Sequence, residues 1–153
     1  MKLVPLFALA CAFAALAADS DADKLPPGQG KELVAKVCVT CHGTDNFRKN
    51  RLKKDDWTAK VSDMVDQGAQ AGPEEAAVII DYLVRNFGEN SKVYVNTAPL
   101  AELKIVLGFS NDEAKAVLAW REEKGDLHVM DDLLKVPGLD AQKVAAKKDL
   151  MAF

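Results

Sequence analysis

Apolar residues recur at spacings of three and four along most of the chain after residue 30, which is the pattern of helices that bury one face. This pattern predicts three helices in the first half of the chain, over residues 30–41, 55–67 and 73–87. Asp55 or Asp56 can cap the second of these helices. Glycines at positions 43, 68 and 88 are placed to end the three helices. We therefore expect a small core built from local contacts.

The pattern changes after residue 92. Two similar blocks follow, and each has a short predicted helix, a turn that contains glycine, and a second predicted helix. The two turns are Gly-Phe-Ser at residues 108–110 and Pro-Gly-Leu at residues 137–139. The chain is therefore expected to be all-α, with one domain over residues 29–90 and another over residues 91–153.

The first 18 residues have the pattern of a secretory signal peptide, in which Lys2 precedes an apolar run and small residues up to Ala18 precede acidic ones. A transmembrane anchor is an alternative, but the run is short for one. A lipid-modified Cys11 is another, but apolar residues continue beyond it. We expect cleavage after Ala17 or Ala18, a periplasmic mature protein without a membrane span, and a mobile acidic leader over residues 19–28.

Composition and charge narrow the possible partners. The chain has 153 residues, of which 49% are hydrophobic and 28% charged, as is ordinary for a soluble globular protein. Its formal net charge of −3 leaves no overall basic excess that would attract nucleic acid. After removal of the predicted signal peptide, the only remaining cysteines are Cys38 and Cys41.

These two cysteines belong to a Cys-x-x-Cys-His motif at residues 38–42. Thiols three positions apart on a helix lie on nearly the same face, so both can reach the vinyl groups of one porphyrin edge. His42 follows at once and can bind the iron from one side. The motif therefore indicates a covalently attached c-type haem.

Three other interpretations of the two cysteines compete with haem attachment. A thioredoxin-like redox pair is expected near a βαβ pattern, which this sequence lacks. A zinc site of the common kind needs a second cysteine pair, and the sequence has none. A structural disulfide between Cys38 and Cys41 is the third.

Further haem contacts are predicted around the motif. Met64, on the same predicted helix as Trp57, is the candidate for the second axial ligand, because the other methionines of the mature chain and His128 lie in the C-terminal part. Core packing by Met64, with an open iron, is the alternative. Trp57 is expected to contact the cofactor, and Arg48, in a basic stretch, to pair with a propionate. A solvated loop that only exposes the basic residues is the alternative for that stretch.

The segment from Gly30 to Gly88 resembles class I cytochromes c, in particular the short ones that serve as subunits or domains of periplasmic dehydrogenases. The resemblance is carried by Gly30, Cys38-x-x-Cys41-His42-Gly43, Trp57-x-x-x-Val61-x-x-Met64, Gly68-Ala69, Ile80-Asp81-Tyr82-Leu83 and Phe87-Gly88. It implies a small cytochrome c fold with one haem c, in which the first and last helices cross at Gly30 and Tyr82. The family's aromatic residue four positions after that glycine is Val34 here.

Residues 93–153 resemble the tandem helix-hairpin-helix domain of competence-type extracellular DNA-binding proteins. The motifs that carry this resemblance are Asn96-Thr97-Ala98, Trp120-Arg121-Glu122-Glu123-Lys124-Gly125 and the two hairpin turns. In that family the hairpin, typically Gly-Ile-Gly, offers backbone N–H groups to phosphates. Here Gly-Phe-Ser and Gly-Leu-Asp replace it, and the segment has eight basic and ten acidic residues, a net charge of −2. DNA is therefore a disfavoured partner, and we expect a structural or protein-docking role.

Together these features predict a periplasmic mono-haem cytochrome c. It would carry single electrons from a periplasmic dehydrogenase to an acceptor protein, with the helix-hairpin-helix domain for docking. No catalytic Ser/His/Asp set, acid/base carboxylate pair or phosphate loop is recognisable, so we expect no catalysis of its own. Two alternatives stay open: an extracytoplasmic DNA-binding protein with a redox haem domain, and a ligand-binding haem protein.

Overall fold

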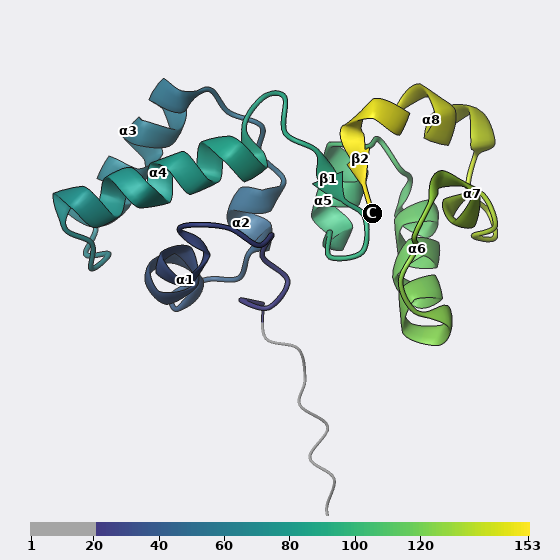
Figure 1. The fold of residues 1–153 in the computed structure, drawn as a ribbon, viewed down its shortest axis with the longest axis horizontal. Helices are drawn as coiled ribbons and strands as arrows, with labels where there is room; N and C mark the ends of the chain where they lie inside the picture. The colour runs from purple at the N-terminus through teal and green to yellow at the C-terminus, as the bar shows by residue number, and fades with distance from the viewer. Residues whose placement is uncertain (1–20) are drawn as a thin grey trace, which may run out of the picture.

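The computed structural model describes residues 21–153, which form two mostly helical units in chain order (Figure 1). The predicted signal peptide and the first two residues of the predicted leader lie outside the described residues. None of the helices in residues 21–153 has the length and apolar character needed to cross a bilayer. The predicted helical character is confirmed apart from one pair of two-residue strands.

The first unit contains the elements that surround the cysteine motif. They are α1 (Lys31–Val34), the π-helix η1 (Ala35–Val39), α2 (Asp45–Arg48), α3 (Lys54–Asp66) and α4 (Pro73–Phe87). The single predicted helix over residues 30–41 is thus divided, because its second half winds as a π-helix, a form that occurs often at functional sites. The short helix α2 lies where the sequence indicated only a basic loop.

Helix α4 is the longest element and packs against both α1 and α3. Pro73 begins it, and the Gly72 N–H donates to the Glu75 carboxylate at 3.0 Å, which satisfies one donor at the helix start. Its buried face is made of residues at helical spacing: Ile79, Tyr82, Leu83, Asn86 and Phe87. These residues form the centre of the first core.

Gly30 and Tyr82 meet where α1 crosses α4, as the cytochrome resemblance implies. Gly30 has a φ of 97°, and a Cβ there would lie 2.8 Å from the Tyr82 Cβ and 3.1 Å from the Val78 carbonyl oxygen. Only glycine combines this backbone conformation with so close an approach. The N-terminal end of the cysteine-bearing segment is therefore held directly against α4.

Part of the predicted mobile leader is packed against the first unit at Leu25 and Pro26, which corrects the expectation for these residues. Leu25 is 2% exposed in the first core, and the Tyr82 hydroxyl donates to the Pro26 carbonyl oxygen at 2.6 Å. Helix α3 also differs from the prediction at its start. Helix α3 begins at Lys54 without a side-chain cap, so Asp55 and Asp56 lie in its first turn, where carboxylates favour the helix dipole.

The second unit contains α5 (Leu100–Ile105), α6 (Asn111–Lys124), α7 (Met130–Leu133), α8 (Ala141–Ala146) and the 3-10 helix η2 (Lys148–Leu150). Strand β1 (Val93–Tyr94) pairs in parallel with β2 (Met151–Ala152), so the end of the described chain returns to the start of this unit (Figure 1). A second core, separate from the first, includes the fully buried Leu103, Val117 and Leu133.

Candidate functional site

A cavity of about 440 Å³ in the first unit brings most of the predicted haem contacts together. Its lining comes from η1, the loop after it, α2, α3, the loop between α3 and α4, and α4. The lining residues are Val37, Cys38, Cys41, His42, Asn46, Phe47, Trp57, Lys60, Val61, Met64, Val65, Gln67, Gly68, Ala69, Ala71, Ile79 and Leu83. Most of these are apolar, so a flat, largely apolar cofactor has suitable walls here.

Both thiols of the motif line this cavity and are free cysteines. Cys38 projects from η1 and is partly buried, whereas Cys41 follows the helix and is exposed. Burial, with a smaller contribution from the neighbouring Cys41, raises the pKa of the Cys38 thiol to about 11. A thioredoxin-like pair needs a thiol of lowered pKa, so the environment of Cys38 disfavours that interpretation.

His42 is partly buried beside the thiols and is oriented by its neighbours. Its Nδ1 lies 3.3 Å from the Gly43 carbonyl oxygen, which can only accept, so the bond forms in the tautomer with a protonated Nδ1. That tautomer leaves Nε2 as the lone-pair donor available to a metal. The Phe47 ring packs edge-on against the imidazole, with centroids 6.5 Å apart.

Met64 and Trp57 reach the same cavity from α3. Trp57 is 1% exposed, and its Nε1–H donates to the Phe87 carbonyl oxygen at 3.2 Å, which ties α3 to the end of α4. Met64 is 37% exposed, too open for a residue that only fills the core. Two thiols, an imidazole and a thioether around mostly apolar walls are a donor set that fits a covalently attached haem.

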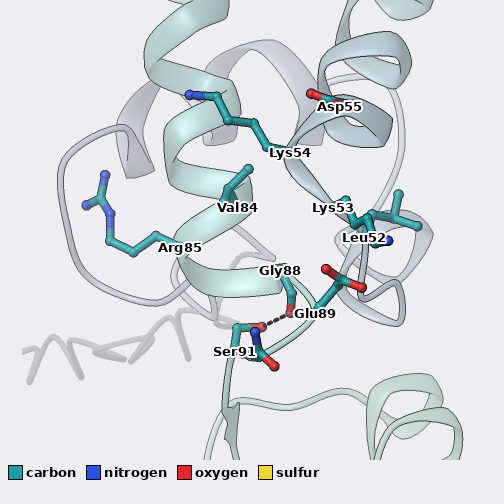
Figure 2. A pocket seen from close by; sticks show the side chains of 10 residues that line it. Leu52, Lys53, Lys54, Asp55, Val84, Arg85, Gly88, Glu89 and Ser91 are labelled. Atoms are coloured by element: carbon teal, nitrogen blue, oxygen red, sulfur yellow. Dashed lines mark hydrogen bonds between the residues drawn. The ribbon is translucent and has the colours of Figure 1, made fainter.

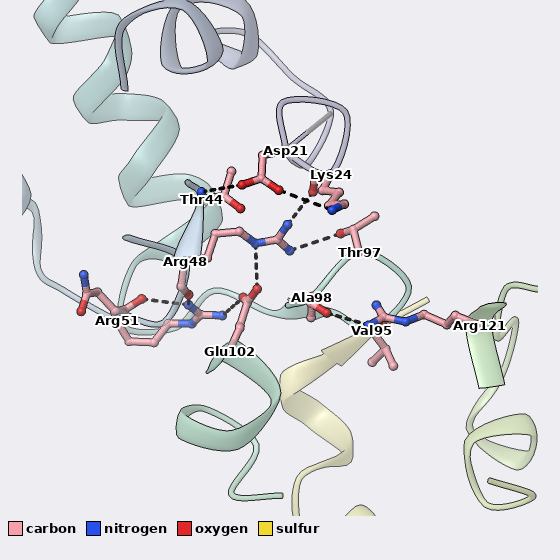
Figure 3. A network of polar contacts seen from close by, with 11 residues as sticks. Asp21, Lys24, Thr44, Arg48, Arg51, Val95, Thr97, Ala98, Glu102 and Arg121 are labelled. Carbon is pink, nitrogen blue, oxygen red and sulfur yellow. Dashed lines mark hydrogen bonds and ion pairs between the residues drawn. The ribbon is translucent and has the colours of Figure 1, made fainter. Parts of the chain in front are cut away.

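Arg48 is the one predicted cofactor contact that the structure places elsewhere. It is fully buried but does not line the cavity. Its Nε donates to Glu102 at 2.8 Å, and its two terminal nitrogens donate to the Lys24 carbonyl oxygen at 2.6 Å and the Thr97 hydroxyl at 3.2 Å (Figure 3). With all three nitrogens engaged in these bonds, the expected propionate contact is replaced by a contact between the two units.

A second cavity, of about 530 Å³, lies between the start of α3 and the end of α4 (Figure 2). Lys53, Lys54 and Arg85 contribute cations to it, and Asp55 and Glu89 contribute carboxylates. The Ser91 hydroxyl donates to the Gly88 carbonyl oxygen at 2.8 Å. This mixture of charges does not select an anion or a cation, so the cavity adds no candidate chemistry.

The second unit contains two hairpins of matching geometry. Gly108 has a φ of 73° and Gly138 a φ of 82°, so each turn uses the left-handed conformation that glycine favours. The residue two positions after each glycine caps the helix that follows. The Ser110 hydroxyl accepts from the Glu113 N–H at 3.1 Å, and the Asp140 carboxylate accepts from the N–H of Gln142 at 2.8 Å.

Glu113 joins the two hairpins, which the sequence analysis did not foresee. Its carboxylate accepts the Ser110 N–H at 2.6 Å and the Asp140 N–H at 3.2 Å, and it pairs with Lys143 at 2.6 Å. The Lys143 and Ser110 hydrogen bonds are the largest causes that lower the pKa of Glu113 to about 2. The Ser-x-x-Glu spacing of a capping box could have revealed the contact with Ser110, but not the one with the second hairpin.

Comparison with known proteins supports the helix-hairpin-helix character of the second unit. A family model described as "Helix-hairpin-helix motif" matches residues 88–151. The ComE operon protein 1 of Bacillus subtilis is 38% identical over 52 residues, which are 34% of this chain and 25% of that protein. The chain therefore aligns with about a quarter of this relative's length. No solved structure matches, and neither the family model nor this relative supports the cytochrome resemblance.

We predict that Glu113 makes the stability of the protein depend on acid pH. A carboxyl group whose pKa is lowered on folding stabilises the protein above its ordinary pKa of 4.5, and this stabilisation is lost as the pH falls toward about 2. In Glu113→Gln the urea midpoint should fall less between these two pH values than in the wild type. Glu123→Gln, which changes an exposed residue of α6, is the control, and its urea midpoint should fall with pH as much as that of the wild type. An equal fall of the midpoint in all three proteins would contradict the prediction.

Proposed function

We infer that the first unit carries one covalently attached haem c and that the protein transfers single electrons. The observation that supports this most strongly is that Cys38, Cys41, His42 and Met64, which span 27 positions of the chain, line one cavity. Chance core packing does not require that the two free thiols, the imidazole beside them and a partly exposed thioether share one apolar space.

Each of these residues has a distinct role in the proposal. Cys38 and Cys41 tether the porphyrin, with Cys38 as a neutral thiol at ordinary pH because its pKa is near 11. The Nε2 of His42 is the proximal ligand, and its ring is held by Gly43 and Phe47. The Met64 sulfur is the distal ligand. Haem supplies reversible one-electron chemistry when bound, and the apolar walls exclude water from it.

The predicted export signal is consistent with this role, because c-type haem in bacteria is attached outside the cytoplasm. In the proposed role the protein accepts electrons from a periplasmic dehydrogenase and passes them to an acceptor protein. It has no catalytic activity of its own. The cytochrome resemblance of residues 30–88 and the shared cavity support this proposal.

The distal ligand can be tested by substitution. In protein produced with haem attached, Met64→Ala should abolish the weak thioether-to-iron absorption band near the red edge and lower the midpoint potential, because the thioether favours ferrous iron. Val65→Ala removes an apolar side chain from the same cavity wall and should retain the band. An oxidised spectrum of Met64→Ala that equals the wild type would contradict the assignment.

DNA binding by the second unit is a second candidate function, and the comparisons favour it. The helix-hairpin-helix match covers residues 88–151, and the chain is also similar to ComE operon protein 1. Two observations oppose it. The backbone N–H groups of Ser110 and Asp140 already donate hydrogen bonds to the Glu113 carboxylate. In addition, residues 93–153 carry a net charge of −2. Phosphate binding depends largely on cationic side chains, so any affinity should be weak and sensitive to salt.

A gel-shift measurement tests this candidate. If the second unit binds DNA, duplex DNA should shift at low salt, and the shift should disappear as salt is raised. The double variant Lys147→Gln, Lys148→Gln should weaken the shift, whereas Lys36→Gln, an exposed lysine of the first unit, should not. The absence of a shift at low salt would dispose of the candidate and leave the haem proposal unaffected.

A further inference from the structure

The two units meet at a buried carboxylate that two arginines share (Figure 3). Glu102 lies on α5 of the second unit and is 1% exposed. Its Oε2 accepts from the Nε of Arg48 at 2.8 Å, and its Oε1 accepts from Arg51 at 2.7 Å. Both arginines belong to the first unit, in and just after α2. The single negative charge of Glu102, in the second unit, therefore offsets part of the positive charge of two arginines in the first unit.

Two of the three charged side chains in this cluster are removed from water: Arg48 is 0% and Glu102 1% exposed, whereas Arg51 is 14% exposed. Ions removed from water need close partners and saturated hydrogen bonds, and removal of one partner leaves the other charge uncompensated. Arg48 meets the requirement through Glu102, Lys24 and Thr97. With Glu102 in place, the three ionic side chains sum to one positive charge. Without it they would sum to two.

The cluster is connected to the haem cavity through the rings of Phe87 and Phe47. Arg48 follows Phe47 directly in α2, and Phe47 lines the cavity and packs edge-on against His42. The guanidinium groups of Arg48 and Arg51 lie 5.8 Å and 6.0 Å from the centroid of the Phe87 ring. That ring in turn contacts Phe47, with centroids 5.6 Å apart. Helix α2 is thus fixed by Glu102 and places Phe47 against the imidazole.

We propose that Glu102 is a positioning residue for the haem site: it fixes α2, and with it the wall around His42, and it lowers the positive charge beside the cavity. This inference rests on the proposed haem function. It assigns the helix-hairpin-helix unit a role in the redox centre, since its α5 supplies the carboxylate. The charge of this cluster then shifts the midpoint potential of a haem in the cavity.

Variants that change the charge in opposite directions test the proposal on haem-loaded protein. Glu102→Gln leaves the arginines without their counter-charge and should raise the midpoint potential, because added positive charge disfavours the oxidised iron. Arg51→Gln keeps the Arg48 pair with Glu102 and removes one cation, so it should lower the potential. Asp81→Asn removes one carboxylate from an exposed pair with Lys54 in the first unit and is the charge-matched control for Glu102→Gln.

A second readout does not require haem. In the unloaded protein, amide exchange in α2, where the Arg48 N–H donates to the Thr44 carbonyl oxygen at 3.0 Å, should be faster in Glu102→Gln than in Asp81→Asn. If Glu102→Gln does not fold, Arg51→Gln still decides the direction of the potential shift. The role proposed for Glu102 would be wrong if haem-loaded Glu102→Gln and Arg51→Gln had the midpoint potential of Asp81→Asn and if unloaded Glu102→Gln had the amide exchange of unloaded Asp81→Asn. That result would leave the proposed haem function standing. A wild type that takes up no haem would overturn the proposed function as well.

Discussion

The close approach of Gly30 to Tyr82 fixes the arrangement on which the first unit depends. It holds α1 against α4 and so determines where the following π-helix presents Cys38. On the opposite side, the hydrogen bond from Trp57 to the Phe87 carbonyl holds α3 against the same helix. Helix α4 is therefore the common support for both sides of the cavity. The thiols and His42 reach the cavity from one side, and Met64 reaches it from α3.

The second unit is joined to this arrangement by charge. Its two hairpins are joined by Glu113, whose carboxylate accepts the backbone N–H groups of Ser110 and Asp140. Its helix α5 meanwhile supplies Glu102 to the arginines behind Phe47. These contacts join the second unit to its own chain, while its family match is to the helix-hairpin-helix motif.

Much of this structure could be predicted from local sequence patterns. The strong helical spacing identified α3 and α4, and the glycines at 108 and 138 identified the hairpins. Met64 could be assigned to the site of the Cys-x-x-Cys-His motif because the other methionines of the mature chain lie in the C-terminal part, and the structure brings these residues to one cavity. These features depend on residues close together in the chain or on a known motif.

The features that the sequence did not reveal depend on distant residues. The pairing of Arg48 with Glu102 joins positions 54 apart, so Arg48, which the sequence assigned to a haem propionate, is instead buried against the other unit. The leader seemed mobile because it is acidic and rich in turn residues, but Tyr82, 56 positions after Pro26, binds it. No local pattern encodes such partners. The same holds for the contact of Glu113 with the second hairpin.

The central claim is that the cavity in the first unit holds a haem bound through two thioether links. The most direct measurement is the intact mass of the protein after export from cells that assemble c-type haem. The wild-type protein should have the mass of the polypeptide plus one haem, and the variant in which Cys38 and Cys41 are both replaced by alanine should have the polypeptide mass alone. Wild-type protein that carries only the polypeptide mass would contradict it.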